Sequence, residues 1–154
     1  MIGEAEAVRR MVQVCAGFQP ALAAYEKSEG RLDEGFNVMG ELASWVVAQS
    51  RSGAIQRFDE LFDELEALLA DADEDAWQVL VIGFIEDLHN MTVRLQDPSS
   101  RSDPDVFLSY LGTRTRAEWF RLVNTYLQWG EQWPGRVVDK LGSVPGGSGT
   151  TRTR

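Results

Sequence analysis

Residues 58–90 read FDELFDELEALLADADEDAWQVLVIGFIEDLHN. In the first half of this stretch, apolar side chains recur at spacings of three and four, which predicts an amphipathic helix over about 54–70. Its apolar face consists of Ile55, Phe58, Leu61, Phe62, Leu65, Leu68 and Leu69. The acidic turn that follows favours a second helix start, because carboxylates in a first turn interact well with the helix dipole. We expect Asp73 or a neighbour to cap that second helix.

The second helix is predicted over about 74–95 and is apolar on two sides. Its main stripe, taken at about 100° per residue, consists of Trp77, Leu80, Val81, Phe84, Leu88, Met91 and Leu95. Three further apolar residues fall nearly opposite this stripe, namely Val79, Ile82 and Val93. A helix with two apolar sides needs neighbours on both, so we expect it in the middle of a helical bundle.

Similar spacings and helix-boundary residues predict the remaining helices. They are residues 4–16, Pro20 to Gly30, 33–50, Pro104 to Gly112, and Thr115 to about Gln128. The 33–50 helix has Asp33 as its expected cap and Phe36 at the start of an apolar stripe. Thr115 and Glu118 have the spacing of a capping box, which places the start of the last helix at Thr115. No segment shows the alternation that is typical of a strand.

These elements predict an all-α fold, either an irregular bundle or a short stack of helical hairpins, with about seven helices. The absence of a clear internal sequence period favours the irregular bundle. Residues 1–141 are predicted to form a single helical domain. Residues 142–154, GSVPGGSGTTRTR, are predicted to be a flexible tail because Gly, Ser and Thr dominate them.

Length and composition place the chain among ordinary cytoplasmic proteins. Its 154 residues suit one domain, and 44% of them are hydrophobic, which is enough for one core. Cys15 is the only cysteine, so no intramolecular disulfide is possible and a reducing compartment fits. The amino-terminal stretch lacks the apolar run of a signal peptide, and no segment approaches a membrane span. We therefore expect a cytoplasmic location and no membrane partner.

The formal charge of −9 is concentrated in one segment. Of the 24 acidic residues, nine lie between Asp59 and Asp75, where there is no Lys or Arg. The other 15 acidic residues balance the 15 Lys and Arg of the chain. A phosphate backbone needs concentrated basic side chains, so nucleic acid is not expected as a ligand. A protein partner with a basic surface fits this field better.

No catalytic, metal-binding or cofactor-binding motif is complete in this sequence. Asp71, Asp73 and Asp75 resemble the start of a calcium loop, but Ala76 and Ile82 occupy the positions that require Gly and Glu. Glu86 and His89 have the Glu-x-x-His spacing of di-iron bundles, which need two such motifs, and His89 is the only histidine. Neither a zinc site nor a nucleophilic Cys15 has further support. We expect no enzyme activity, cofactor or metal.

Two interpretations of the acidic segment stay open. The carboxylates are either a solvated face that keeps the protein in solution or a docking surface for a basic partner. Like-charged neighbours at i,i+4, such as Asp59 and Asp63, destabilise a helix slightly, which solubility alone does not explain. The candidate partner-binding residues are Asp59, Glu60, Asp63, Glu64, Glu66, Asp71, Asp73, Glu74, Asp75, Glu86, Asp87, His89 and Asn90.

The stretch 58–90 and the later FLSYLGTRTRAEWFRLVNTYLQW (107–129) carry a resemblance over roughly residues 33–130. An acidic amphipathic helix, an acidic turn, the VIGFIEDL helix and the YLG…W element resemble a family of small helical bacterial proteins. Members of that family are often encoded beside polymorphic or contact-dependent toxins and are regarded as immunity proteins. The resemblance implies a cytosolic antitoxin that binds and neutralises a cognate toxin domain, and it implies no catalytic residues. The alternative is a helical adaptor or scaffold without a toxin partner.

Overall fold

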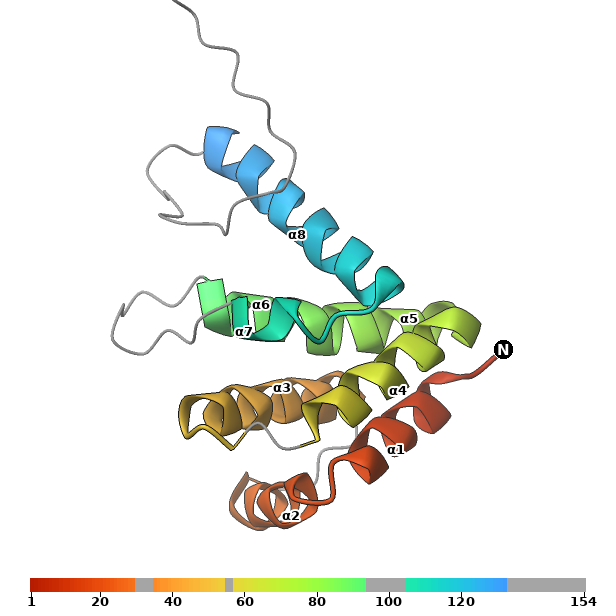
Figure 1. The fold of residues 1–154 in the computed structure, drawn as a ribbon. Coiled ribbons are helices and arrows are strands. Elements are labelled where there is room, and N and C mark those ends of the chain that lie inside the picture. The colour runs from red at the N-terminus through yellow and green to blue at the C-terminus, as the bar shows by residue number, and fades with distance from the viewer. Residues whose placement is uncertain (30–34, 55–56, 94–104, 133–154) are drawn as a thin grey trace, which may run out of the picture.

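The computed structural model describes residues 1–29, 35–54, 57–93 and 105–132, and these ranges contain helices and no strand (Figure 1). The helices are α1 (Glu4–Val14), α2 (Phe18–Glu29), α3 (Gly35–Arg51), α4 (Phe58–Asp71), α5 (Glu74–Gln78), the π-helix η1 (Val79–Glu86), α6 (Asp87–Val93), α7 (Asp105–Leu108) and α8 (Thr113–Gln132). Because α5, η1 and α6 follow one another without a break, the described ranges hold seven helical segments. The all-α prediction is confirmed. The predicted tail, residues 142–154, lies outside these ranges.

The continuous helix α5–η1–α6 lies in the middle of the bundle. Its η1 and α6 parts contact α3, and its first part, α5, contacts α1. Helix α8 also contacts η1. In Figure 1 it runs between α8 and α3, and α4 crosses beside α1. Phe84 and Leu88, from its predicted main stripe, are almost completely buried, and so is Val79 from the opposite side. The prediction of a central helix with neighbours on two sides is confirmed.

Aromatic rings from α4, η1 and α7 form the centre of the core. Phe62 lies 6.4 Å from Phe84 and 6.2 Å from Phe107, measured between ring centroids. Phe58 stacks on Phe107 at 6.1 Å between centroids, and the Tyr110 ring contacts the rings of both Phe58 and Phe62. The amphipathic face predicted for α4 therefore packs against rings from η1 and from residues 107–110, which fixes α4 in place.

The helix η1 is a π-helix, which the spacing of the sequence did not predict. Its turns are wider than those of an α-helix because each backbone bond spans one more residue. Gly83 lies where η1 crosses α3, and a Cβ there would come within 3.1 Å of Met39 Cβ. The absent side chain lets the two helices approach closely at this crossing.

Two apolar residues that were predicted to pack are instead exposed. Ile82, placed on the second apolar side of the central helix, is 42% exposed, and Phe36 on α3 is 40% exposed. The π-helical turns change the angular position of Ile82 relative to an α-helix. Phe36 lies in the first turn of α3 near Gly83, so the two exposed side chains belong to the same helix crossing.

Helix boundaries differ from the predictions by a few residues. Helix α1 ends at Val14, two residues early, because the chain turns through Cys15 toward α2. Helix α4 begins at Phe58 and not near residue 54, since Arg57 takes a left-handed conformation with φ 68°. The expected cap Asp33 lies outside the described residues.

None of the described helices carries an apolar stretch long enough to cross a membrane.

Candidate functional site

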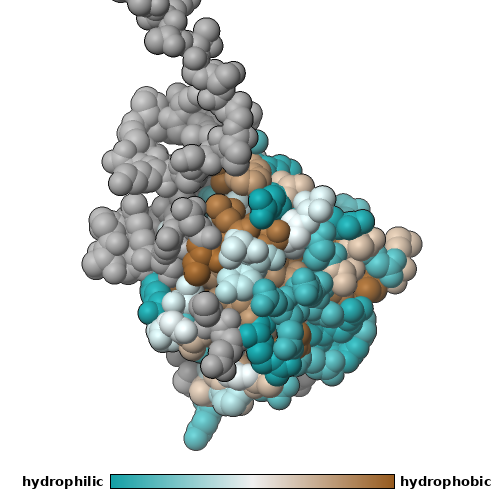
Figure 2. All heavy atoms as spheres, in the orientation of Figure 1, coloured by the Kyte–Doolittle hydropathy of each residue, from teal (hydrophilic) through white to brown (hydrophobic). Residues whose placement is uncertain are grey.

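The acidic side chains of α4 fall into three groups according to the direction in which they point. Asp59, Glu60 and Asp63 lie on the exposed side of the helix, opposite the buried leucine and phenylalanine stripe. Glu64 points to α1 and Glu66 points to α8, as their partners show. Figure 2 shows that hydrophilic residues gather over the α1 and α4 region of this face. We call Asp59, Glu60 and Asp63 the outer acidic surface.

Glu64 forms an ion pair with α1 and is half-buried. Its Oε1 accepts a hydrogen bond from Arg10 Nε at 2.5 Å, and both side chains are less than one-third exposed. The hydrogen bond to Glu64 raises the pKa of the Arg10 guanidinium above its ordinary value. Glu64, a predicted partner-binding residue, therefore joins two helices of the bundle.

Glu66 caps the amino-terminal end of α8. Its carboxylate accepts hydrogen bonds from Arg114 N at 2.8 Å, from Thr115 N at 3.0 Å and from Thr115 Oγ1 at 3.1 Å. A helix start presents unpaired backbone N–H groups, and a carboxylate satisfies them well. A Cβ at Gly112 would come within 2.6 Å of the Glu66 carboxylate, so glycine makes room for this contact.

The balance of burial and hydrogen bonding sets the pKa of Glu66. Burial by itself would raise the pKa, but the hydrogen bonds from Thr115 and Arg114 outweigh it. The pKa of Glu66 therefore lies below its ordinary value. The predicted capping box is wrong: α8 begins at Thr113, and Glu118 forms an ion pair with Arg121. The cap comes from another helix, which no local spacing can reveal.

The acidic turn before α5 also has structural contacts. Asp73 Oδ1 accepts a hydrogen bond from Ala76 N at 2.8 Å, which confirms Asp73 as the cap of α5. Backbone bonds join Ile2 N to Asp71 O and Asp73 N to Ile2 O, and the amino-terminal ammonium lies 3.2 Å from Asp71 Oδ1. These contacts hold the amino-terminal residues against the turn between α4 and α5.

Four of the nine acidic residues between Asp59 and Asp75 form ion pairs within the described part of the chain, and a fifth, Asp73, caps α5. On the outer acidic surface, Glu60 pairs with Arg57, and both side chains are half exposed. Within the described part of the chain, Asp59, Asp63, Glu74 and Asp75 are the exposed carboxylates of the segment that form no ion pair or hydrogen bond. The acidic segment is therefore two small exposed surfaces, not one continuous face.

The predicted site residues of the central helix are less accessible than expected. His89 is fully buried, and its ring lies edge-on to Trp119 of α8 at 5.0 Å and 74°. This burial is a correction, because a partner cannot contact His89 in the folded chain. Glu86 and Asn90 are half-buried and have partners within the chain.

Asp87 is half-buried against α3. A Cβ at Gly40 would come within 2.9 Å of Asp87 Oδ2, so the carboxyl group lies on the α3 backbone at this glycine. Burial, and to a smaller extent the charge of Glu86, raises the pKa of Asp87. Of these four residues, Glu86, Asp87 and Asn90 keep enough exposure to reach a partner.

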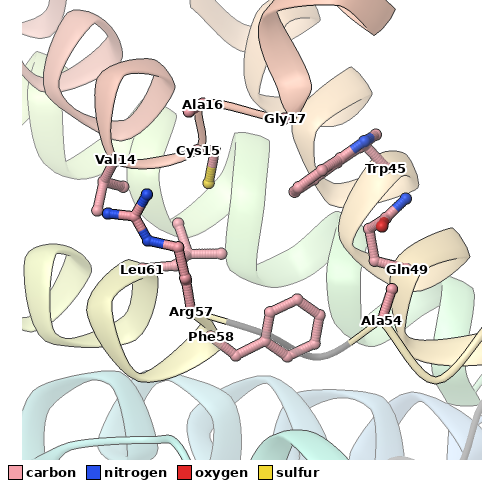
Figure 3. Close-up of a pocket in the computed structure, with 10 residues that line it drawn as sticks. All are labelled: Val14, Cys15, Ala16, Gly17, Trp45, Gln49, Ala54, Arg57, Phe58 and Leu61. Carbon is pink, nitrogen blue, oxygen red and sulfur yellow. The ribbon is translucent and has the colours of Figure 1, made fainter.

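A hollow of about 310 Å³ lies at the other end of α4, and sequence reasoning missed it. The end of α1, the turn to α2, the second half of α3 and the first turn of α4 enclose it (Figure 3). Its walls include Cys15, Trp45, Gln49, Arg57, Phe58 and Leu61. These residues come from separate segments, so no motif in the sequence could have signalled the hollow.

Burial makes the thiol of Cys15 unreactive. The side chain is 6% exposed, and burial raises the pKa of the thiol to about 12, against the opposing charge of Arg57. Among the described residues, no three His, Cys, Asp or Glu side chains gather as a metal ion would need. Neither observation gives a reacting group to this part of the molecule.

The single cysteine allows a direct test of this burial. At pH 8, a thiol with a pKa of about 12 has a thiolate fraction about a thousandfold below that of an ordinary cysteine. We expect dithionitrobenzoate to label the native chain at least about a hundredfold more slowly than the urea-unfolded chain. Release of thionitrobenzoate reports Cys15 alone. Equal labelling rates would contradict the buried position.

Comparison with known proteins places the chain in one family. A family model described as "Domain of unknown function (DUF7674)" matches residues 8–128, so the chain belongs to this family. The match spans α1 to most of α8 and includes α4 and the central helix. No curated protein and no solved structure is significantly similar to the chain.

Proposed function

We propose that this member of the DUF7674 family is an immunity-type protein that binds a cognate bacterial toxin in the cytoplasm and neutralises it. The outer acidic surface of α4 is the docking surface in this proposal. The sequence resemblance described above supports the role, and one structural observation supports the place. That observation is the exposure of Asp59, Glu60 and Asp63 on a helix that other contacts hold rigidly.

Rigid placement matters because a docking helix that is already ordered loses little entropy on binding. Helix α4 is fixed by its buried aromatic face, by Glu64 on Arg10 and by Glu66 on α8. Asp59 and Asp63 remain as like-charged neighbours at i,i+4 with no ion pair among the described residues. Glu60 and Glu64 share that spacing, but Arg57 and Arg10 neutralise them. The uncompensated pair is what a basic partner would stabilise.

The role does not require any group that reacts. An inhibitor blocks a toxin by covering its active site or substrate cleft, and opposite charges accelerate the encounter. Many toxins that act on nucleic acid need a basic cleft for phosphate groups, to which carboxylates of an inhibitor are complementary. We therefore propose a toxin domain with a basic surface as the partner, and no nucleic acid or membrane ligand.

An adaptor without a toxin partner is the second candidate, and one observation favours it. Phe36 and Ile82 are large apolar side chains exposed at the same helix crossing. Single π-helical turns occur frequently at functional sites, and protein interfaces are enriched in aromatic residues such as phenylalanine. A partner of the adaptor type would use this crossing and would be insensitive to charge on α4.

Charge reversal on α4 tests the proposed docking surface. We expect Asp59→Lys with Asp63→Lys to slow association with the toxin domain encoded beside this chain by at least about tenfold at low salt. Dissociation should change less, because steering acts on the encounter. Both side chains are exposed, so stability should change by less than about 0.5 kcal/mol. Stopped-flow or biolayer measurements at several salt concentrations give both rates.

The matched control is Glu26→Lys with Glu41→Lys, which changes the net charge equally on α2 and α3. It should leave the association rate within about twofold of wild type. No association of the wild-type chain with this toxin domain would favour the adaptor candidate. Unchanged association for the α4 variant, together with loss of binding for Ile82→Lys, would place the toxin interface at the helix crossing instead of on α4. Equal slowing by both charge variants would mean that net charge acts without a specific surface.

A further inference from the structure

Two aromatic side chains, Trp45 and Phe58, line the hollow beside Cys15, and each packs against another aromatic ring of the core. The indole of Trp45 contacts Phe18 at 6.0 Å between centroids, and Phe58 stacks on Phe107 at 6.1 Å. In Figure 3 the Trp45 ring points toward the centre of the hollow, and the Phe58 ring borders it from another side. Because their other contacts fix these rings, the space between them exists before any ligand binds.

The polar groups of the hollow lie at its edge. Figure 3 shows the Arg57 guanidinium and the Cys15 thiol close to each other, with the Gln49 amide across the hollow. Arg57 binds Glu60 through Nε and Nη2. Its Nη1 forms no hydrogen bond within the described residues, so it can donate to a ligand. Its backbone is left-handed, with φ 68°, a conformation that costs a non-glycine residue energy and clusters at binding sites.

Arg57 contributes positive charge at the edge of the hollow, and its ion pair with Glu60 offsets part of that charge. Arg57 is the charged group that acts on the Cys15 thiol, and it opposes the effect of burial on the pKa of that thiol. A positive field in a partly apolar space attracts an anion and repels a cation.

We propose that the hollow binds a small aromatic carboxylate. The ring of the ligand lies between Trp45 and Phe58, and its carboxylate accepts hydrogen bonds from Arg57. The volume of about 310 Å³ is near the lower end for small-molecule pockets, so it suits one or two fused rings. Guanidinium groups recognise carboxylates through parallel hydrogen bonds, and aromatic walls favour a flat body. This site is independent of the proposed toxin partner.

The probe is 2-naphthoate, and 2-naphthamide is its uncharged counterpart of the same shape. Titration of 2-naphthoate into the full chain, monitored by calorimetry or by amide chemical shifts, should give a Kd of about 0.1–1 mM. Binding of 2-naphthamide should be about tenfold weaker because it lacks the charge that Arg57 pairs. No binding of 2-naphthoate up to about 5 mM, or equal binding of both probes, would overturn the proposal.

Two kinds of variant separate the hollow from other surfaces. Ala54→Trp fills the hollow from its exposed rim and should weaken both probes at least tenfold, whereas Ala48→Trp on exposed α3 should weaken neither. Arg57→Asn keeps a residue that tolerates the left-handed backbone, and it should remove the preference for 2-naphthoate while 2-naphthamide binds as before. Should Ala54→Trp fail to fold, Ala16→Trp fills the hollow from the opposite rim. Undiminished binding to a folded filling variant would place the ligand elsewhere and overturn the proposal.

Discussion

Replacing Phe84 with alanine should lower the free energy of unfolding by about 3–5 kcal/mol. The ring is 0% exposed and lies 6.4 Å from Phe62, between the central helix and α4. Alanine there loses the transfer free energy of the ring and leaves a cavity that the surrounding rings cannot fill. Urea unfolding followed by far-UV circular dichroism measures the change. A domain of this size has only about 5–15 kcal/mol in total, so the loss is large.

Ile82→Ala is the matched control because Ile82 lies two residues away on the same π-helix. Its side chain is 42% exposed, and we expect its removal to cost less than about 1 kcal/mol. The contrast tests which side of η1 faces the core. A loss below about 1 kcal/mol for Phe84→Ala, or an equal loss for Ile82→Ala, would mean that η1 has a different orientation.

The sequence predicted the parts of the fold that depend on local periodicity. Most described residues of the two predicted stripes are buried, because a face apolar at helical spacing has to pack against something. They are Phe58, Leu61, Phe62, Leu65 and Leu68 of α4, and Leu80, Val81, Phe84 and Leu88 of the central helix. The cap at Asp73 was also predictable, since its partner Ala76 lies three residues along the chain. In each case the residues that determine the feature are neighbours in the sequence.

The features that were missed depend on contacts between distant residues. The cap of α8 needs Glu66, 48 positions before Arg114, so the local spacing of Thr115 and Glu118 was misleading. The π-helical turns of η1 follow no periodicity that differs from an α-helix in so short a stretch. The prediction of His89 as a partner-binding residue is wrong because Trp119 of α8, 30 positions later, packs against its ring.

The acidic segment illustrates the same limit for the candidate site. Charge counting located the nine carboxylates correctly and suggested a single surface. Their roles depend on neighbours from other helices, since Arg10 of α1 pairs with Glu64 and the backbone at the start of α8 binds Glu66. Only the direction of each side chain separates carboxylates that hold the fold together from those that remain for a partner. Asp59 and Asp63 belong to the second group.

The contact between Glu66 and α8 should be among the most costly polar contacts to remove. We expect Glu66→Ala to lower the free energy of unfolding by about 2 kcal/mol, since it leaves the N–H groups of Arg114 and Thr115 without their carboxylate. Glu66→Gln keeps an oxygen acceptor but loses the charge, so its loss should be about half as large. Glu60→Ala on the same helix removes an exposed ion pair and should cost less than about 0.5 kcal/mol.

The pH dependence of this difference identifies the carboxylate itself. Because the pKa of Glu66 in the folded chain lies below its ordinary value of 4.5, the stabilisation is complete above that value and is lost as the pH falls through the lower folded pKa. The stability difference between wild type and Glu66→Gln should therefore be constant near neutral pH and shrink below about pH 4.5. Urea unfolding at a series of pH values measures it. A difference that stays constant in acid, or that grows, would show that Glu66 acts through its shape and packing and that its charge does not stabilise the start of α8.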